Sequence, residues 1–97
     1  MKKTAVTAVI IAKNEAKMLV GCLASLEWCD SVLVIDNGSA DETVAIAEQM
    51  GAKVVHIKHD SFDRLRTDAL KFVQTPWVFY IDADERVTPE LASAIQD

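Results

Sequence analysis

The chain has no cluster of basic residues, and this absence excludes a large class of partners. Its 97 residues include 10 Lys and Arg against 15 Asp and Glu, so the net charge is −5. A protein that binds nucleic acid needs a basic face for the phosphates, and no segment of this sequence supplies one. We therefore expect no nucleic-acid partner.

Cysteine and long apolar runs are also scarce, which bears on the compartment. Cys22 and Cys29 have neither the spacing of a metal site nor the number needed for a disulfide framework, and reduced thiols are typical of cytosolic proteins. The apolar run near the N-terminus is interrupted by Thr7 and ended by Lys13, well short of a membrane span. We expect the domain to be cytoplasmic, with peripheral attachment to the inner membrane face as an option for a full-length protein.

Linkers, repeats and low-complexity segments are missing as well, so we expect residues 1–97 to form one small domain. What is present is an alternation of two hydrophobic patterns. Continuous apolar runs, typical of parallel strands covered on both faces, occupy residues 5–11, 31–35, 53–57 and 77–81. Apolar residues at helical spacing predict helices over residues 15–26, 39–50 and 62–73 and from residue 88 onward. We predict a capping box between Ser39 and Glu42 for the second helix, and Thr88 as the cap of the fourth.

Strands that alternate with helices favour right-handed crossovers and a parallel, Rossmann-like α/β sheet with helices on both faces. Short connections predict the strand order 3-2-1-4. This order leaves a switch point between the first and fourth strands, and open α/β sheets bind ligands at the carboxyl ends of the strands at such a point. The residues that follow the strands are therefore the candidates for function.

All four apolar strands are followed by polar or acidic residues. The segments are AKNE at 12–15, DNGS at 36–39, KHD at 58–60 and DADE at 82–85. A single acidic strand end is common. Four such ends at one edge of a sheet indicate a site.

Asp82 and Asp84 are the candidates for metal binding. They flank Ala83, so in an extended backbone their carboxylates point to the same side. Two such carboxylates suit a hard divalent cation, Mg²⁺ or Mn²⁺, although a strand that simply ends in a turn could carry the same acids. Glu85 is out of phase with the pair and would face solvent or pair with Arg86.

The other polar strand ends each have a structural alternative. Asp36 could accept hydrogen bonds from a nucleotide base or ribose, or it could stiffen its own loop as an Asx turn. Asn14 and Glu15 could equally begin the first helix, because Glu is favoured in a first turn. His56 and His59 lack a third soft ligand nearby, so we expect no zinc site there.

Taken together, these segments resemble the nucleotide-binding part of family 2 glycosyltransferases, the inverting enzymes of GT-A fold. The resemblance rests on VIIAKNE (9–15), VLVIDNGSADETVAIAEQMGAKV (32–54) and WVFYIDADERVTPEL (77–91). The chain is similar in particular to bacterial enzymes that build the lipopolysaccharide core and other cell-surface glycans. It implies transfer of a sugar from a nucleotide-diphosphate donor to a hydroxyl of a glycan or lipid-linked acceptor, with inversion.

The resemblance also implies roles for individual residues. The nucleotide-binding residues would be Asn14, Glu15, Asp36, Arg66 and Asp82, and the divalent cation would be held by Asp84 together with Asp82. Relatives usually have Gln and Asn on either side of the arginine, where this chain has Leu65 and Thr67, so donor preference is expected to differ.

Members of this family continue well beyond the length of this chain. We therefore expect residues 1–97 to be a truncated part, inactive alone, with the general base beyond Asp97 and self-association through apolar surface on the fourth strand. The alternative is a non-catalytic nucleotide-binding or assembly module. A nucleotidyltransferase is disfavoured because AKNEAKML is not a Gly-rich basic loop.

Overall fold

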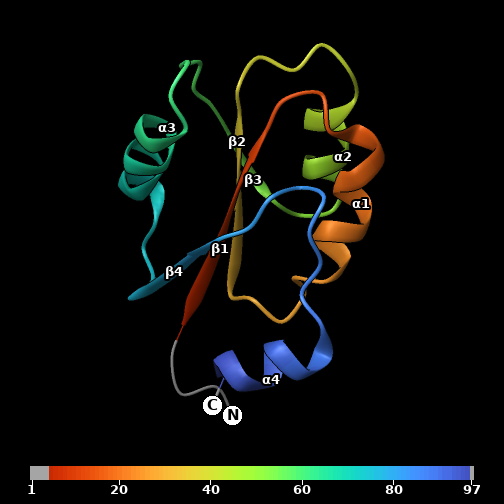
Figure 1. The fold of residues 1–97 in the computed structure, drawn as a ribbon, viewed down its shortest axis with the longest axis vertical. Coiled ribbons are helices and arrows are strands. Elements are labelled where there is room, and N and C mark those ends of the chain that lie inside the picture. Colours follow the sequence, from red (N-terminus) through yellow and green to blue (C-terminus); the bar gives the residue numbers. More distant parts are fainter. Residues whose placement is uncertain (1–4, 97) are drawn as a thin grey trace.

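The computed structural model describes residues 5–96, which form one four-stranded parallel sheet between helices (Figure 1). Its strands are β1 (Val6–Ala12), β2 (Ser31–Asp36), β3 (Lys53–His56) and β4 (Trp77–Tyr80). The spatial order is β3-β2-β1-β4 and every pairing is parallel. The predicted order is confirmed, and the switch point lies between β1 and β4.

Helices cover both faces of the sheet, as predicted. They are α1 (Ala16–Ala24), α2 (Thr43–Gln49), α3 (Phe62–Ala69), the short 3-10 helix η1 (Leu70–Phe72) and α4 (Pro89–Gln96). Figure 1 shows α1 and α2 on one face, α3 on the other, and α4 beyond the end of the sheet where β1 begins. None of the helices in residues 5–96 has the length and apolar content needed to cross a lipid bilayer.

Alternate residues of β1 supply two separate cores. Ala8, Ile10 and Ala12 face α1 and α2, whereas Val9 packs on the other side with Leu65 of α3. This is the two-residue period of a strand. Because both faces are covered, the sequence of β1 is apolar apart from Thr7. The result fixes the carboxyl ends of β1, β2 and β4 at one edge of a rigid sheet.

One predicted helix start is wrong and another is confirmed. The capping box at residues 39–42 does not form, because α2 begins at Thr43 and the hydroxyl of Ser39 accepts a hydrogen bond from Asn14 N instead (3.0 Å). The loop after β2 is thus held by the loop after β1 rather than by its own helix. At the other end of the chain, Thr88 Oγ1 accepts from Leu91 N (3.1 Å) at the start of α4, as predicted.

Candidate functional site

The loops after β1 and β2 are joined by backbone-to-side-chain hydrogen bonds. Besides the bond from Asn14 N to Ser39, Ala40 N donates to Asn14 Oδ1 (2.7 Å), and Glu15 N donates to Thr43 Oγ1 (3.0 Å). Asn14 adopts a φ of 56°, the left-handed region that asparagine enters more readily than most residues. Asn14 therefore has the structural role considered as an alternative in the sequence: it turns the chain into α1, and it also binds the neighbouring loop.

Asp36 lies at the end of β2 and is only 5% exposed. Its Oδ1 accepts from Ser39 N (3.1 Å), and its Oδ2 lies 3.0 Å from His56 Nδ1 at the end of β3. Burial alone would raise the pKa of this carboxyl. Hydrogen bonds from Ser39 and His56 outweigh that effect and hold the pKa below its usual value. The carboxylate is therefore ionised, and it stiffens its loop as the structural alternative predicted.

His56 is a site residue that the sequence reasoning missed. The sequence analysis weighed it only as a zinc ligand, together with His59. Its contact with Asp36 follows from the register of β2 and β3, in which Asp36 and His56 are direct partners. The predicted strands end at Ile35 and Ile57, so pairing their last residues does not give this contact, which depends on the register of the folded sheet.

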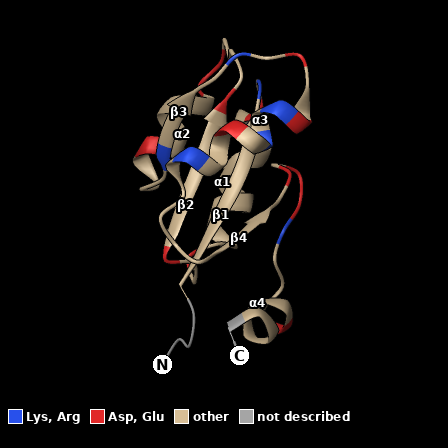
Figure 2. Ribbon diagram, turned by 90° about the vertical axis from the view of Figure 1, so that its left-hand side faces the viewer, with Lys and Arg blue, Asp and Glu red and all other residues tan. Residues whose placement is uncertain are grey.

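The acidic segment after β4 is a turn rather than a continuation of the strand. β4 ends at Tyr80, and Glu85 N donates to the carbonyl oxygen of Asp82 (2.9 Å). The extended backbone assumed for residues 82–84 is therefore wrong, although the expected alternation of exposure persists: Asp82 and Asp84 are exposed and Ala83 is 3% exposed. Figure 2 shows this acidic loop in red between β4 and α4.

Glu85 is exposed, which is one of the two predicted alternatives, and it does not pair with Arg86. Its Oε1 accepts from Asp82 N (2.8 Å), so its carboxylate closes the turn instead of pairing with Arg86. The guanidinium of Arg86 is bound to backbone carbonyl groups. All three acids of this loop are exposed, but the carboxylate of Glu85 is bonded to Asp82 N, which leaves the carboxylates of Asp82 and Asp84 as the pair available to a ligand.

These two carboxylates fit a particular kind of metal site. Within residues 5–96 no group of three or more His, Cys, Asp or Glu side chains is arranged to hold a metal ion, so the protein offers no complete cage. Mg²⁺ and Mn²⁺ sites built on one or two carboxylates take their other ligands from water and substrate phosphates. The donor set of Asp82 and Asp84 fits that type of hard divalent cation.

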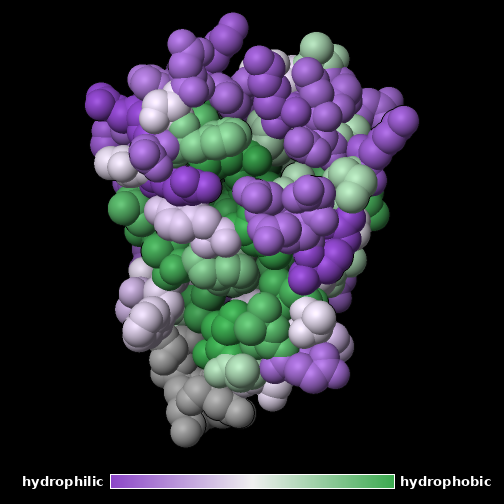
Figure 3. Space-filling view, in the orientation of Figure 1, coloured by the Kyte–Doolittle hydropathy of each residue, from purple (hydrophilic) through white to green (hydrophobic). Residues whose placement is uncertain are grey.

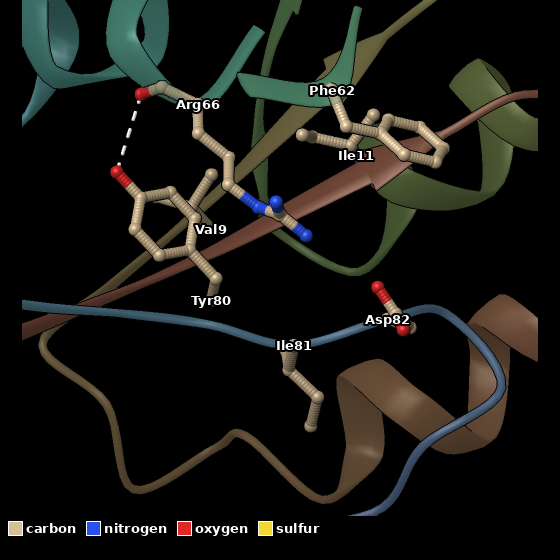
Figure 4. Close-up of a pocket in the computed structure, with 7 residues that line it drawn as sticks. All are labelled: Val9, Ile11, Phe62, Arg66, Tyr80, Ile81 and Asp82. Atoms are coloured by element: carbon tan, nitrogen blue, oxygen red, sulfur yellow. Dashed lines mark hydrogen bonds between the residues drawn. The ribbon is translucent and has the colours of Figure 1, made fainter.

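Arg66 and Asp82 line the same pocket, at the switch point of the sheet (Figure 4). The side chain of Arg66 extends from α3 between two aromatic rings, with its guanidinium carbon 5.9 Å from the ring centroids of both Phe62 and Tyr80. Tyr80 Oη donates to the backbone oxygen of Arg66 (3.2 Å). The floor of the pocket is formed by Val9, Ile11 and Ile81.

Phe62, one of the apolar residues whose spacing predicted the helix over 62–73, is not buried and is 61% exposed. It forms the wall of this pocket instead. The pocket volume is about 30 Å³, far below the roughly 300–1,000 Å³ of clefts that hold small-molecule ligands. A ligand of nucleotide size would therefore extend beyond it, over the loops after β1 and β4.

Solved structures share this fold. The parallel 3-2-1-4 sheet superimposes on glycosyltransferases of GT-A fold. Staphylococcus aureus TarS 1–349 matches with a TM-score of 0.83 and 23% identity, over 94% of this chain and 31% of that one. Glucosyl-3-phosphoglycerate synthase of Mycobacterium tuberculosis, in complex with Mn²⁺, UDP and glucosyl-3-phosphoglycerate, matches with a TM-score of 0.78 and 21% identity, over 97% of this chain and 40% of that one.

The sequence defines the family. A sequence model named Glycosyl transferase family 2 matches residues 7–97, and the chain belongs to this family. An uncharacterized glycosyltransferase of Rickettsia felis is 38% identical over 94% of this chain and 32% of its own length. The lipopolysaccharide core biosynthesis glycosyltransferase LpsC of Rhizobium meliloti is 30% identical over 98% of this chain and 37% of its own length. The chain thus spans about a third of these relatives.

Proposed function

We propose that this chain binds the nucleotide-diphosphate sugar donor of an inverting glycosyl transfer to a glycan or lipid-linked acceptor. One observation carries the proposal: the exposed acidic turn after β4 and Arg66 of α3 meet in the pocket between β1 and β4. That place is the switch point, where open α/β sheets bind their ligands. Membership of glycosyl transferase family 2 supports the choice of ligand.

The charges at this place suit a diphosphate. Arg66 supplies a fixed positive charge and a planar set of donors, the arrangement that recognises phosphate oxygens. Asp82 and Asp84 would repel a diphosphate on their own, and a divalent cation, Mg²⁺ or Mn²⁺, held by these carboxylates would remove that repulsion. When bound, such an ion stabilises the negative charge that develops on the leaving diphosphate.

The nucleoside would lie over the loops after β1 and β2. Asp36 is ionised and each of its oxygens has two lone pairs, so it can accept a further hydrogen bond from a base while it keeps Ser39 and His56. Asn14 Oδ1 is occupied by Ala40, which leaves its NH₂ group to donate. Glu15, which is half-buried at the start of α1, completes the proposed set.

The chain supplies donor contacts but no evident general base. In residues 82–85 the two outward carboxylates are assigned to the cation, and Glu85 is used to close the turn. A general base must take the proton of the acceptor hydroxyl. We therefore propose that the base and the acceptor site lie in the part of such enzymes that this chain does not span, and that residues 1–97 alone bind donor without transferring sugar.

LpsC is named for the lipopolysaccharide core, which favours a cell-surface glycan as the acceptor class. The cytoplasmic location expected from the cysteine content stays a prediction.

Calorimetry of this chain with UDP, with and without Mn²⁺, tests the proposal. UDP should bind more tightly with Mn²⁺, and Asp84→Asn should remove that gain while leaving the affinity for uridine unchanged. Glu48→Gln, at an exposed position on α2, is the matched control and should behave as the wild type. Equal affinity of the wild type for UDP with and without Mn²⁺ would contradict the metal assignment. Failure to bind any nucleoside diphosphate would contradict the function.

A further inference from the structure

Arg86 follows the acidic turn and binds three backbone carbonyl groups. Its Nη1 donates to the carbonyl oxygens of Ala83 (2.9 Å) and Glu85 (2.7 Å), and its Nη2 donates to that of Met18 (2.8 Å). Ala83 and Glu85 belong to the turn after β4, whereas Met18 belongs to α1. One side chain therefore ties the turn to the helix.

Gly21 provides the room for this contact. It lies in the middle of α1, where glycine destabilises a helix relative to alanine. A Cβ atom at Gly21 would lie 2.6 Å from Nε and 2.8 Å from Nη2 of Arg86, distances that real side chains do not adopt. The guanidinium is the end of a flexible side chain and would have to shift, which would disturb its bonds to the carbonyl oxygens. The absence of a side chain at Gly21 therefore allows Arg86 to pack directly against α1.

Two weaker contacts support the same docking. Val87 N donates to Ser25 Oγ (3.0 Å), and the thiol of Cys22 lies 3.6 Å from the carbonyl oxygen of Asp82. The turn lies beyond the end of β4 and gains no ladder hydrogen bonds from the sheet past Ile81, whose N donates to Val9 O. Bonds between Asp82 and Glu85 close the turn itself. Its position against the rest of the domain depends on contacts with α1, among which Arg86 makes the charged ones.

We propose that Arg86, seated in the space at Gly21, is a positioning residue that holds the carboxylates of Asp82 and Asp84 in the arrangement that a divalent cation requires. The proposal rests on the function proposed above. Arg86 would not contact the ion. It would act through the carbonyl groups of Ala83 and Glu85, which stand on either side of Asp84. Lysine would not reproduce these contacts, because they come from two nitrogens of a planar guanidinium, whereas the three donors of an ammonium group share one nitrogen.

The test compares Arg86→Lys and Gly21→Ala with Arg64→Lys, a control for the Arg-to-Lys change at a solvent-exposed position on α3. Calorimetry measures the affinity for UDP with and without Mn²⁺, and for uridine. Residues that orient metal ligands typically contribute about 10–100-fold to metal affinity. Arg86→Lys and Gly21→Ala should therefore lower the Mn²⁺-dependent affinity for UDP about 10-fold or more, without changing the affinity for uridine. Arg64→Lys should change neither.

A double-mutant cycle distinguishes the docking of Arg86 from a general effect on α1. In an Arg86→Ala background the clash is gone, so adding Gly21→Ala should cause no further loss of affinity and should raise the melting temperature through better helix propensity. The proposal is overturned if the single variants keep the Mn²⁺-dependent gain, or if they lose uridine affinity in proportion. If the wild type itself shows no such gain, the metal assignment is the part that fails and the inference falls with it.

Discussion

Leu65→Ala is the change that best tests how the site is held together. Leu65 is fully buried in the small core between α3 and the sheet, with Val9, Leu33, Ile35 and Ala69. Truncating a buried leucine costs about 2–5 kcal/mol of unfolding free energy. Because this core is small and α3 can partly close onto the sheet, we expect about 3 kcal/mol. A domain of this size has a total stability of about 5–15 kcal/mol, so the loss is a large fraction of it.

Urea unfolding followed by circular dichroism measures the effect. With a dependence of free energy on urea of about 1 kcal/mol per M, the midpoint should fall by about 2–3 M. Leu70→Ala is the matched control, because Leu70 is 47% exposed on η1 and exposed substitutions usually change stability by less than about 0.5 kcal/mol. Equal urea midpoints for Leu65→Ala and Leu70→Ala would refute the burial of Leu65 in the core between α3 and the sheet. Since Leu65 directly precedes Arg66, Leu65→Ala should also weaken UDP binding at urea concentrations where the variant is still folded.

Three further predictions concern ionisation and assembly. Burial raises the pKa of the Cys22 thiol to about 11, so it should resist iodoacetamide at pH 8 in the native protein and react on unfolding; rapid native alkylation, located by mass spectrometry, would contradict this. The folded-state pKa of Asp36 is lowered, so its stabilising contribution is present above the unfolded pKa of about 4 and is lost as pH falls through the folded value. Asp36→Asn should therefore flatten the loss of unfolding free energy with acid, measured by urea unfolding at several pH values. Trp77 is 62% exposed on the edge strand β4, so sedimentation should show concentration-dependent self-association that Trp77→Gln reduces.

Exposed apolar side chains on β4 and α4 would mediate this association. An apolar area extends down the middle of the face seen in Figure 3. Exposed apolar side chains on β4 and α4 include Trp77, Tyr80, Leu91 and Ile95. Contiguous exposed apolar surface favours association. If the protein stays monomeric at all concentrations, the prediction of self-association is wrong.

Local patterns in the sequence determined the elements and their order. Apolar runs and helical spacing depend on neighbouring residues, so the four strands, the main helices and the Thr88 cap could be predicted from them. The order β3-β2-β1-β4 followed because right-handed crossovers and short connections leave few alternatives. The acids that follow the strands could be identified as candidate site residues for the same reason, because they lie where each local apolar pattern ends.

Contacts between distant segments were decided only by the tertiary structure. Ser39 satisfies a local capping rule, yet its hydroxyl binds Asn14 in another loop. Asp36 meets His56 only because β2 and β3 pair in one register. Arg86 meets Gly21 because the turn after β4 packs on α1. A hydrogen-bonding group takes whichever partner the folded chain brings within reach, and that choice depends on the packing of segments that the local sequence does not encode.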